Sequence, residues 1–231
     1  MTDPAILIEG LRFAWKGHAP VLDVPSFRLA RGERLFLRGP SGSGKSTLLG
    51  VIAGVLEADA GKVSVLGQDL AALSSSARDR IRADHLGVIF QMFNLVPYLS
   101  VVGNVTLPLK FSAARRKAVG GSADAEARRL LGRLGLRDDA MLDRRVSDLS
   151  VGQQQRVAAA RALIGAPEIV IADEPTSALD ADARDRFIAL LSEEAARTGA
   201  ALLFVSHDAS LARLFDRAVD LAEINRAGAT A

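Results

Sequence analysis

Hydrophobic residues recur along the chain with two different spacings. Segments in which they alternate with polar residues predict strands, and segments in which they recur every three to four residues predict helices. Apolar and polar positions alternate over residues 5–15 and 24–38, and a short strand and turn follow at residues 61–70. Uninterrupted apolar runs predict buried strands at residues 86–91, 168–173 and 201–206. Helical spacing covers residues 40–56, 122–136, 152–165 and 180–199, and a more polar helix is expected at residues 74–84.

Apolar strands that alternate with helices predict an α/β protein with a parallel sheet covered by helices. A helix-rich middle, approximately residues 92–160, interrupts this alternation and predicts an inserted helical subdomain. The length of 231 residues suits one domain with such a subdomain, so a single domain is expected over residues 1–231.

One segment, residues 86–109, carries no formal charge and is long enough to cross a bilayer. However, two prolines and two asparagines interrupt it, and they would leave backbone groups unpaired in lipid. We therefore predict a buried strand followed by an apolar surface loop, in a soluble protein that docks on an apolar partner.

Composition narrows the function classes only slightly. The chain has no cysteine, which excludes a disulfide framework and a thiolate metal site. Its formal net charge of +2 is weak support for a nucleic-acid partner, and none is predicted. The first ten residues lack the basic and apolar regions of a signal peptide, so none is expected there.

The stretch "GPSGSGKST" fits the pattern G-x-x-x-x-G-K-[ST] of a phosphate-binding loop. Glycines let successive backbone N–H groups curl toward a phosphate, Lys45 adds a positive charge, and Ser46 offers a hydroxyl to Mg²⁺. A flexible Gly/Ser turn is the alternative, but the stretch follows a predicted strand and opens a predicted helix, as the motif requires. The predicted nucleotide-binding residues are Gly39, Pro40, Ser41, Gly42, Ser43, Gly44, Lys45, Ser46 and Thr47.

Two adjacent acids, Asp173 and Glu174, end the apolar strand "IVIA". By themselves they could cap a helix or lie on the surface. In a protein with a phosphate loop they predict that Asp173 holds Mg²⁺ and that Glu174 is the general base for an attacking water.

The stretch "LSVGQ", Leu149 to Gln153, resembles the signature motif of the nucleotide-binding subunits of ATP-binding cassette (ABC) transporters, and the likeness covers nearly the whole chain. The resemblance implies a P-loop NTPase (RecA-like) parallel-sheet core, an N-terminal antiparallel β subdomain and the inserted helical subdomain. It also implies a head-to-tail homodimer in which each ATP lies between one subunit's glycine loop and the other's signature. Ser150, Gly152 and Gln153 would then contact the ATP bound by the partner, with the dipole of the signature helix aimed at it.

The remaining motifs follow in the family's order. Gln91 in "VIFQ" resembles the glutamine that reaches Mg²⁺ and the water, and His207 in "VSHD" resembles the histidine that contacts the γ-phosphate. "SALD" (residues 177–180) resembles the loop that couples the two sites, so Asp180 is expected beside the nucleotide. Trp15 stands where the family has a ring that stacks on adenine; core packing of Trp15, or stacking by Phe13, is the alternative. The implied catalytic residues are thus Glu174, His207, Gln91 and Lys45, and the implied Mg²⁺ ligands are Ser46, Gln91 and Asp173.

Residues 90–109 and "DEPTSALD" most resemble the group that contains lipoprotein-releasing (Lol-type), macrolide-exporting (MacB-type) and cell-division ATPases. The resemblance implies an ATPase that drives a separate membrane permease in export or membrane extraction of lipoprotein, peptide or lipophilic cargo. It also implies a peripheral subunit on the cytoplasmic face of the inner membrane. The apolar stretch Met92–Leu99 is the expected docking site for a permease helix, although core packing would also explain it.

Three other functions are alternatives for a chain with a phosphate loop. A non-transporting ATPase that regulates a membrane partner would carry the same motifs. A soluble cassette acting on DNA or ribosomes is disfavoured, because the chain has neither a long coiled coil nor a second cassette. A P-loop kinase or GTPase would not need "LSVGQ" with His207.

A short basic cluster spans Arg115–Lys117. Its composition favours a solvated helix end over contact with lipid headgroups.

Overall fold

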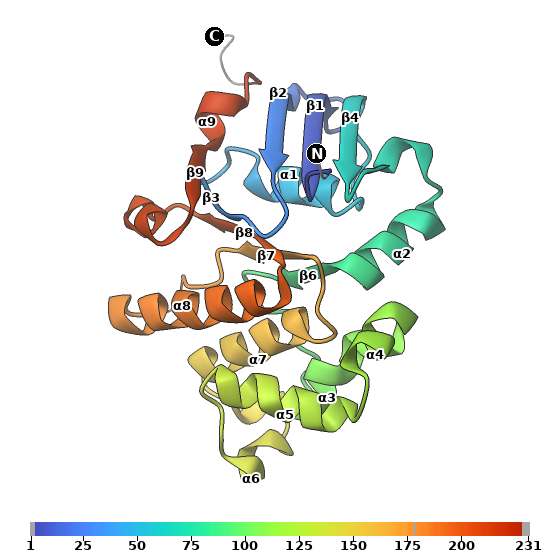
Figure 1. The fold of residues 1–231 in the computed structure, drawn as a ribbon. Coiled ribbons are helices and arrows are strands. Elements are labelled where there is room, and N and C mark those ends of the chain that lie inside the picture. Colours follow the sequence, from blue (N-terminus) through green and yellow to red (C-terminus); the bar gives the residue numbers. More distant parts are fainter. Residues whose placement is uncertain (1–2, 178, 228–231) are drawn as a thin grey trace. The chain divides into compact units, whose positions relative to one another are not determined.

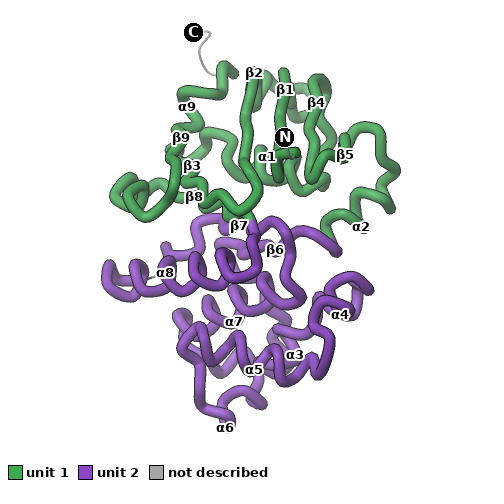
Figure 2. Tube along the Cα trace, viewed as in Figure 1, with its two compact units in different colours: residues 1–82, 201–231 green, residues 83–200 purple. Residues whose placement is uncertain are grey.

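The computed structural model describes residues 3–177 and 179–227. The chain forms two compact units, coloured separately in Figure 2: residues 1–82 with 201–231, and residues 83–200. We call them unit 1 and unit 2. The predicted helical insertion, residues 92–160, lies inside unit 2, which also includes the strands and the helix on either side of it.

Unit 1 contains an antiparallel sheet in the order β2-β1-β4-β5. Strand β1 pairs with β2 on one side and with β4 on the other. Along β1, buried and more exposed side chains largely alternate, as the sequence predicts. The strands are β1 (Ile6–Ala14), β2 (Pro20–Leu29), β4 (Ala60–Val65) and β5 (Gln68–Asp69).

A parallel group of strands completes unit 1. Strand β3 (Arg34–Arg38) pairs in parallel with β8 (Ala201–Ser206) and with β9 (Arg217–Asp220). Phe36 stacks on Phe204 and Phe215, with ring centroids 6.4 and 5.5 Å away, so aromatic packing holds this group together. The helices here are α1 (Lys45–Ile52), which directly follows the phosphate loop, and α9 (Leu221–Ile224) (Figure 1). Helix α2 (Ser75–His85) carries the chain into unit 2.

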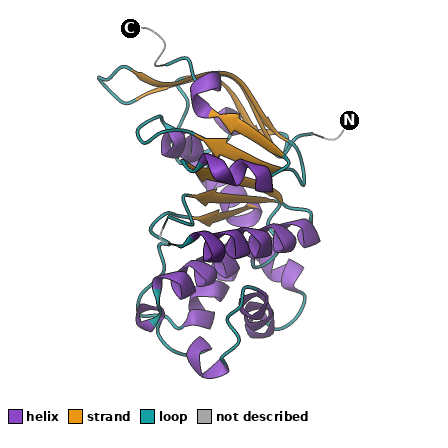
Figure 3. Ribbon diagram, turned by 90° about the vertical axis from the view of Figure 1, so that its left-hand side faces the viewer, coloured by secondary structure: helices purple, strands orange, loops and turns teal. Residues whose placement is uncertain are grey.

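Unit 2 combines a parallel strand pair with most of the helices, which are purple in Figure 3. Strand β6 (Leu86–Ile89) pairs with β7 (Ile169–Asp173), and α7 (Val151–Leu163) packs on β6. The other helices are α3 (Val101–Thr106), α4 (Ala113–Val119), α5 (Ala123–Arg133), α6 (Asp139–Leu142) and α8 (Ala181–Thr198). Short 3-10 helices span Leu70–Ala72, Leu107–Lys110, Val146–Asp148 and Ala209–Leu214.

Local signals in the sequence set the ends of the long helices. Ser122 accepts a hydrogen bond from the Ala125 amide at the start of α5, and Gly199 adopts a left-handed conformation after α8. The expected apolar stripe of α5 is buried as predicted: Ala127, Leu130, Leu131 and Leu134.

The prediction of a surface loop after β6 is wrong in its second half, because α3 forms there. The Ser100 hydroxyl accepts from the Gly103 amide, and the fully buried Asn104 side chain accepts from the Val96 amide at 2.7 Å and donates to the Val96 carbonyl at 3.0 Å. Asn104 therefore holds the preceding loop against this short helix. Hydrophobic spacing does not reveal such a side-chain contact with the backbone. Within the described part of the chain, no helix is long and apolar enough to cross a membrane.

The basic cluster forms the expected solvated helix end at Arg116 and Lys117, which are exposed in the last turn of α4, but the prediction is wrong for Arg115. Arg115 is buried, and its guanidinium donates to the carbonyls of Leu86 and Ile164, the latter at 3.3 Å. Burial lowers the pKa of Arg115 to about 10. Arg115 therefore ties α4 to the backbone beside β6 and α7, and it is not available to lipid headgroups.

Candidate functional site

The phosphate loop is already curled in unit 1. The Ser43 amide donates to the Pro40 carbonyl at 3.2 Å, and Gly42 and Gly44 have φ angles of 80° and 95°. Left-handed glycines of this kind allow the N–H groups of a loop to converge on a phosphate. The loop leads directly into α1, whose first turn carries Ser46 and Thr47.

Two of the glycines have no room for a side chain. A Cβ on Gly39 would lie 2.7 Å from the Ser43 hydroxyl oxygen and 3.3 Å from the Cβ of Leu221. A Cβ on Gly44 would lie 3.1 Å from the Leu22 side chain, at a φ that L-residues rarely adopt. A side chain at Gly39 would therefore require the Ser43 hydroxyl to move, and one at Gly44 would be strained by the backbone conformation.

Lys45 is held across this loop. Its side chain is only 8% exposed, and its Nζ donates to the carbonyl oxygens of Gly39 at 2.7 Å and Pro40 at 2.9 Å. The buried Ser43 hydroxyl has no hydrogen-bond partner among the described residues. A phosphate in the loop would satisfy that hydroxyl and take up the lysine charge, so this part of the site fits a nucleotide.

Asn225 supports the loop from the far end of the chain. Its amide nitrogen donates to the Val21 carbonyl at 2.9 Å and reaches the Ser43 carbonyl at 3.5 Å, and its oxygen accepts from the Asp23 amide at 2.8 Å. Asn225 was not among the predicted site residues, because a single asparagine in "AEINRAG" carries no spacing signal.

Trp15 lies at the surface of unit 1 and Phe13 lies beneath it. The indole is 48% exposed, whereas Phe13 is buried, and the two rings meet edge to face with centroids 5.0 Å apart. Exposure argues against the core-packing alternative for Trp15, and burial argues against Phe13 as the stacking ring. Stacking of Trp15 on adenine remains a prediction.

Parallel strand registers place several predicted residues at the carboxyl ends of neighbouring strands. In unit 1, Arg38 pairs with Ser206, so Gly39 and His207 each follow directly beyond the paired ends of β3 and β8. In unit 2, Ile89 pairs with Ala172, so Asp173 is the last residue of β7 and Gln91 lies just beyond the end of β6. Ligand sites of parallel α/β sheets lie at these ends.

Glu174 has a strained backbone. It is half-buried, and its φ of 45° lies in the left-handed region, which costs a non-glycine residue about 1 kcal/mol. Strain of this kind persists where the surrounding structure requires a particular side-chain position. This supports a specific role for Glu174, although general-base catalysis itself remains a prediction.

The proposed Mg²⁺ ligands are all hard oxygen donors: a hydroxyl of Ser46, the amide oxygen of Gln91 and a carboxylate of Asp173. Such donors suit Mg²⁺, which keeps several water or phosphate ligands. Among residues 3–177 and 179–227 no group of three His, Cys, Asp or Glu side chains could hold a metal.

The signature motif forms the start of α7. Ser150 caps this helix: its hydroxyl accepts from the Gln153 amide at 3.4 Å, while the Gln153 side chain accepts from the Ser150 amide at 2.9 Å. Ser150 and Val151 are exposed and Gly152 is half-buried, so the helix start is accessible to an anion. The side chain of Gln153 is engaged in the cap, which leaves Ser150 as the more available contact.

In the "SALD" loop, residues 177–180, Ala178 lies outside the described residues. Asp180 caps α8 by accepting from the Ala183 amide at 2.8 Å, and Ser177 is exposed. The contact of Asp180 with nucleotide remains a prediction, and the structure assigns this carboxylate a local capping role.

The predicted docking segment is exposed. Met92 is 82% and Tyr98 is 74% exposed, and Phe90 next to them is also exposed, while Phe93, Leu95, Val96 and Leu99 are half-buried. Core packing therefore does not explain Met92 and Tyr98.

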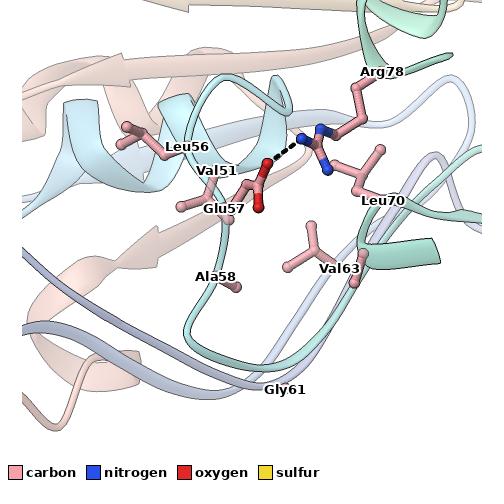
Figure 4. Close-up of a pocket in the computed structure, with 9 residues that line it drawn as sticks. Val51, Leu56, Glu57, Ala58, Gly61, Val63, Leu70 and Arg78 are labelled. Atoms are coloured by element: carbon pink, nitrogen blue, oxygen red, sulfur yellow. Dashed lines mark hydrogen bonds and ion pairs between the residues drawn. The ribbon is translucent and has the colours of Figure 1, made fainter. Parts of the chain in front are cut away.

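One cavity, of about 260 Å³, lies in unit 1 away from every predicted site residue. Figure 4 shows Arg78 and Glu57 pointing toward each other across it, joined by an ion pair, with apolar side chains around them. It is lined by Val51, Leu56, Glu57, Ala58, Gly61, Val63, Leu70, Ala71 and Arg78. Since its only charges neutralise each other, it offers no ligand-specific group.

Comparison with known proteins agrees with these features. A model of the family described as "ABC transporter" matches residues 22–177. The lipoprotein-releasing system ATP-binding protein LolD of Anaeromyxobacter dehalogenans (strain 2CP-C) is 43% identical over 223 residues, which are 95% of this chain and 91% of that protein. LolD of Novosphingobium aromaticivorans is 40% identical, over 96% of this chain and 98% of that protein.

A solved structure gives the same result for the fold. A dimeric post-hydrolysis state of the ATP-binding cassette MJ0796, bound to ADP and Pi, superposes with a TM-score of 0.82 at 31% identity, covering 93% of each chain. The predicted fold class, a P-loop NTPase with a parallel core, an antiparallel β part and helices, is confirmed.

Proposed function

The chain belongs to the ABC transporter family, and we propose that it is the ATP-hydrolysing subunit of a transporter that releases lipoproteins from a membrane. The observation that carries the proposal is a complementary pair of half-sites in one chain. A curled phosphate loop holds Lys45 in unit 1, and an exposed, capped signature helix begins at Ser150 in unit 2.

In the proposed cycle, two copies bind ATP between them. The backbone N–H groups of the phosphate loop and Lys45 hold the β- and γ-phosphates, and Trp15 stacks on adenine. Ser150 and the N-terminus of α7 from the second copy complete the site at the γ-phosphate. The dimeric MJ0796 cassette, which is similar to this chain over 93% of its length, supports this arrangement.

Hydrolysis requires a base and groups that stabilise charge. Glu174 accepts a proton from water as the water oxygen bonds to the γ-phosphorus and the bond to the β–γ bridging oxygen breaks, yielding ADP and phosphate. His207 and Gln91 orient the water and the γ-phosphate. Mg²⁺, held by Ser46, Asp173 and Gln91, would neutralise charge on the β- and γ-phosphate oxygens.

Closing and reopening of this dimer would drive a membrane permease. The exposed apolar side chains Met92 and Tyr98 offer a surface for a permease helix. The permease would hold this subunit on the cytoplasmic face of the inner membrane. Likeness to two LolD proteins over nearly the whole chain favours lipoprotein release over a purely regulatory role.

The test is affinity purification of the tagged Glu174→Gln protein from gently solubilised native membranes with ATP. We expect a stoichiometric integral membrane protein with a large domain outside the cytoplasm, and ATP turnover reduced by at least about 100-fold. Lys45→Met is the control that should prevent ATP-dependent capture.

A second pair of variants tests the docking segment. Met92→Asp should abolish capture of the membrane protein, whereas Val55→Asp, which also adds a charge at an exposed apolar position but in unit 1, should not. A stable ATP dimer without any membrane partner would contradict transport and leave only the ATPase. Wild-type turnover in Glu174→Gln would contradict the assigned base.

A further inference from the structure

The turn after Gln91 has a strained backbone. The Phe93 amide donates to the Phe90 carbonyl at 2.9 Å, and the Asn94 amide donates to the Met92 carbonyl at 2.6 Å. Phe93 and Asn94 both have positive φ angles, 58° and 49°. The left-handed conformation costs Phe93 about 1–2 kcal/mol and Asn94 less, because asparagine tolerates this region, so other contacts must hold the turn at Phe93.

Arg161 supplies those contacts. Its two terminal nitrogens donate to the carbonyl oxygens of Phe93 at 2.5 Å and Asn94 at 2.6 Å. The guanidinium is largely withdrawn from water, and this burial lowers the pKa of Arg161. Its planar fork engages both strained residues at once, which the single ammonium of a lysine cannot do in the same way.

Arg161 and the signature belong to the same rigid element. Arg161 lies in the last turn of α7, and Ser150 caps the first turn of that helix. They are eleven positions apart, which corresponds to roughly 17 Å along the helix at about 1.5 Å per residue. Buried side chains of α7, including Val157 and Leu163, pack the helix in unit 2, so it moves as one body. A displacement of the turn at Phe93 therefore acts on the helix that carries Ser150.

We propose that Arg161 is a positioning residue that couples the docking turn at Met92–Asn94 to the signature helix. Arg161 touches neither nucleotide nor partner in this account, and it acts through the two carbonyls that it holds. The inference rests on the proposed function, because it assumes that Ser150 meets ATP and that Met92 meets the permease. ATP contact at Ser150 would therefore shift the turn at Phe93, and permease contact at Met92 would shift the helix end at Ser150.

The absence of cysteine from the sequence permits a direct test with single spin labels. A label is attached at Met92→Cys or at Val151→Cys, both in the Glu174→Gln protein, and its mobility is measured with and without MgATP. The exposed Val151 reports whether the signature end of α7 is engaged, and Met92 reports the turn. Each label is then combined with Arg161→Met.

The matched control is Arg156→Met, which removes the same charge from the same helix. Arg156 donates to the Gly135 carbonyl at 3.4 Å and not to the turn. Arg161→Lys, which keeps the charge but loses the fork, guards against misfolding of Arg161→Met. A thermal unfolding curve of each variant verifies that it is folded.

We expect MgATP to immobilise the label at position 151 in every folded variant. The mobility of the label at position 92 should also change with MgATP, both in the protein that keeps Arg161 and Arg156 and in the Arg156→Met variant. This response should fall at least about fivefold with Arg161→Met and partly with Arg161→Lys.

An equal response at position 92 with Arg161→Met, while position 151 still responds, would overturn the coupling role and leave the proposed function intact. No response at position 151 with Arg161 present would overturn both, because the signature would then not meet ATP.

Discussion

The carbonyl oxygen of Ala162 lies where a side chain on Gly87 would be. A Cβ on Gly87 would be only 2.2 Å from this oxygen and 3.2 Å from the Pro167 side chain. Strand β6 and helix α7 therefore meet backbone to backbone, and this contact places the signature helix against the strand that leads to Gln91.

We predict that Gly87→Ala destabilises the protein by about 3 kcal/mol or more, because backbone atoms cannot move aside as a flexible side chain can. Urea or thermal unfolding measures this loss. The control is Gly132→Ala in α5, where a Cβ would meet nothing within 4 Å and where alanine should stabilise by up to about 1 kcal/mol. If Gly87→Ala and Gly132→Ala had the same effect, the close approach would be refuted.

Glu194 ties α5 to α8 within unit 2. Its carboxylate is 1% exposed and accepts from Arg133 at 2.9 Å, Arg197 at 3.1 Å and Arg129 at 3.3 Å. Burial raises the pKa of Glu194, but the hydrogen bonds from Arg133 and Arg197 outweigh this effect and the pKa is lowered. The ion pairs therefore stabilise the fold above about pH 4.5, and their contribution is lost as the pH falls through the folded-state pKa.

We predict that Glu194→Gln costs about 2 kcal/mol at neutral pH, less than a fully buried pair because its arginines are partly solvated. Guanidinium unfolding at several pH values measures the difference, which should shrink in acid. Its neighbour Glu193 provides the control: it is exposed and lies 3.4 Å from Arg133, so Glu193→Gln should change stability by less than about 0.5 kcal/mol. Equal losses of stability from Glu194→Gln and Glu193→Gln would show that the ion pairs of Glu194 do not stabilise the fold.

His85 gives unit 2 a pH dependence near neutrality. Its Nδ1 lies 3.0 Å from a carboxylate oxygen of Glu168, and this hydrogen bond, with the nearby carboxylates, raises the pKa of His85. The stabilisation is therefore fully present below the unfolded pKa of about 6.5, and it is lost as the pH rises through the folded-state value.

We expect the wild-type protein to lose about 0.5 kcal/mol more than His85→Gln between about pH 6 and pH 8. Unfolding curves across this range test the prediction, and an NMR titration of the imidazole signals gives the pKa directly. The matched control is His18→Gln, which removes an exposed histidine of unit 1. Identical pH profiles for wild type and His85→Gln would contradict the His85–Glu168 pair.

Trp15 is the one tryptophan of the sequence, so its fluorescence reports its surroundings without a label. We predict that MgATP alters the intensity and wavelength of emission, since adenine would cover a half-exposed indole. Trp15→Ala should weaken ATP binding by about 5- to 10-fold, and Trp15→Phe by less, because a phenyl ring still stacks. Unchanged emission at saturating ATP would move the adenine contact away from Trp15.

Much of this protein was determined by local sequence. Alternating and helical apolar spacing predicted most strands and helices, and Ser122, Ser150 and Gly199 marked helix ends, because periodicity and caps involve residues within a few positions of each other. The glycine loop was predictable for the same reason. Its hydrogen bonds from Ser43 and Lys45 reach only a few residues along the chain.

The tertiary structure decided what distant residues do. Arg115 and Arg161 look like ordinary surface charges in the sequence, yet each binds carbonyls of segments that are 29 to 68 residues away. Asn104 holds the loop that precedes α3 against this short helix, and Asn225 supports a loop 182 residues earlier. A long polar side chain has the same local pattern whether it is solvated or buried, and only the folded chain shows which backbone carbonyl comes within its reach.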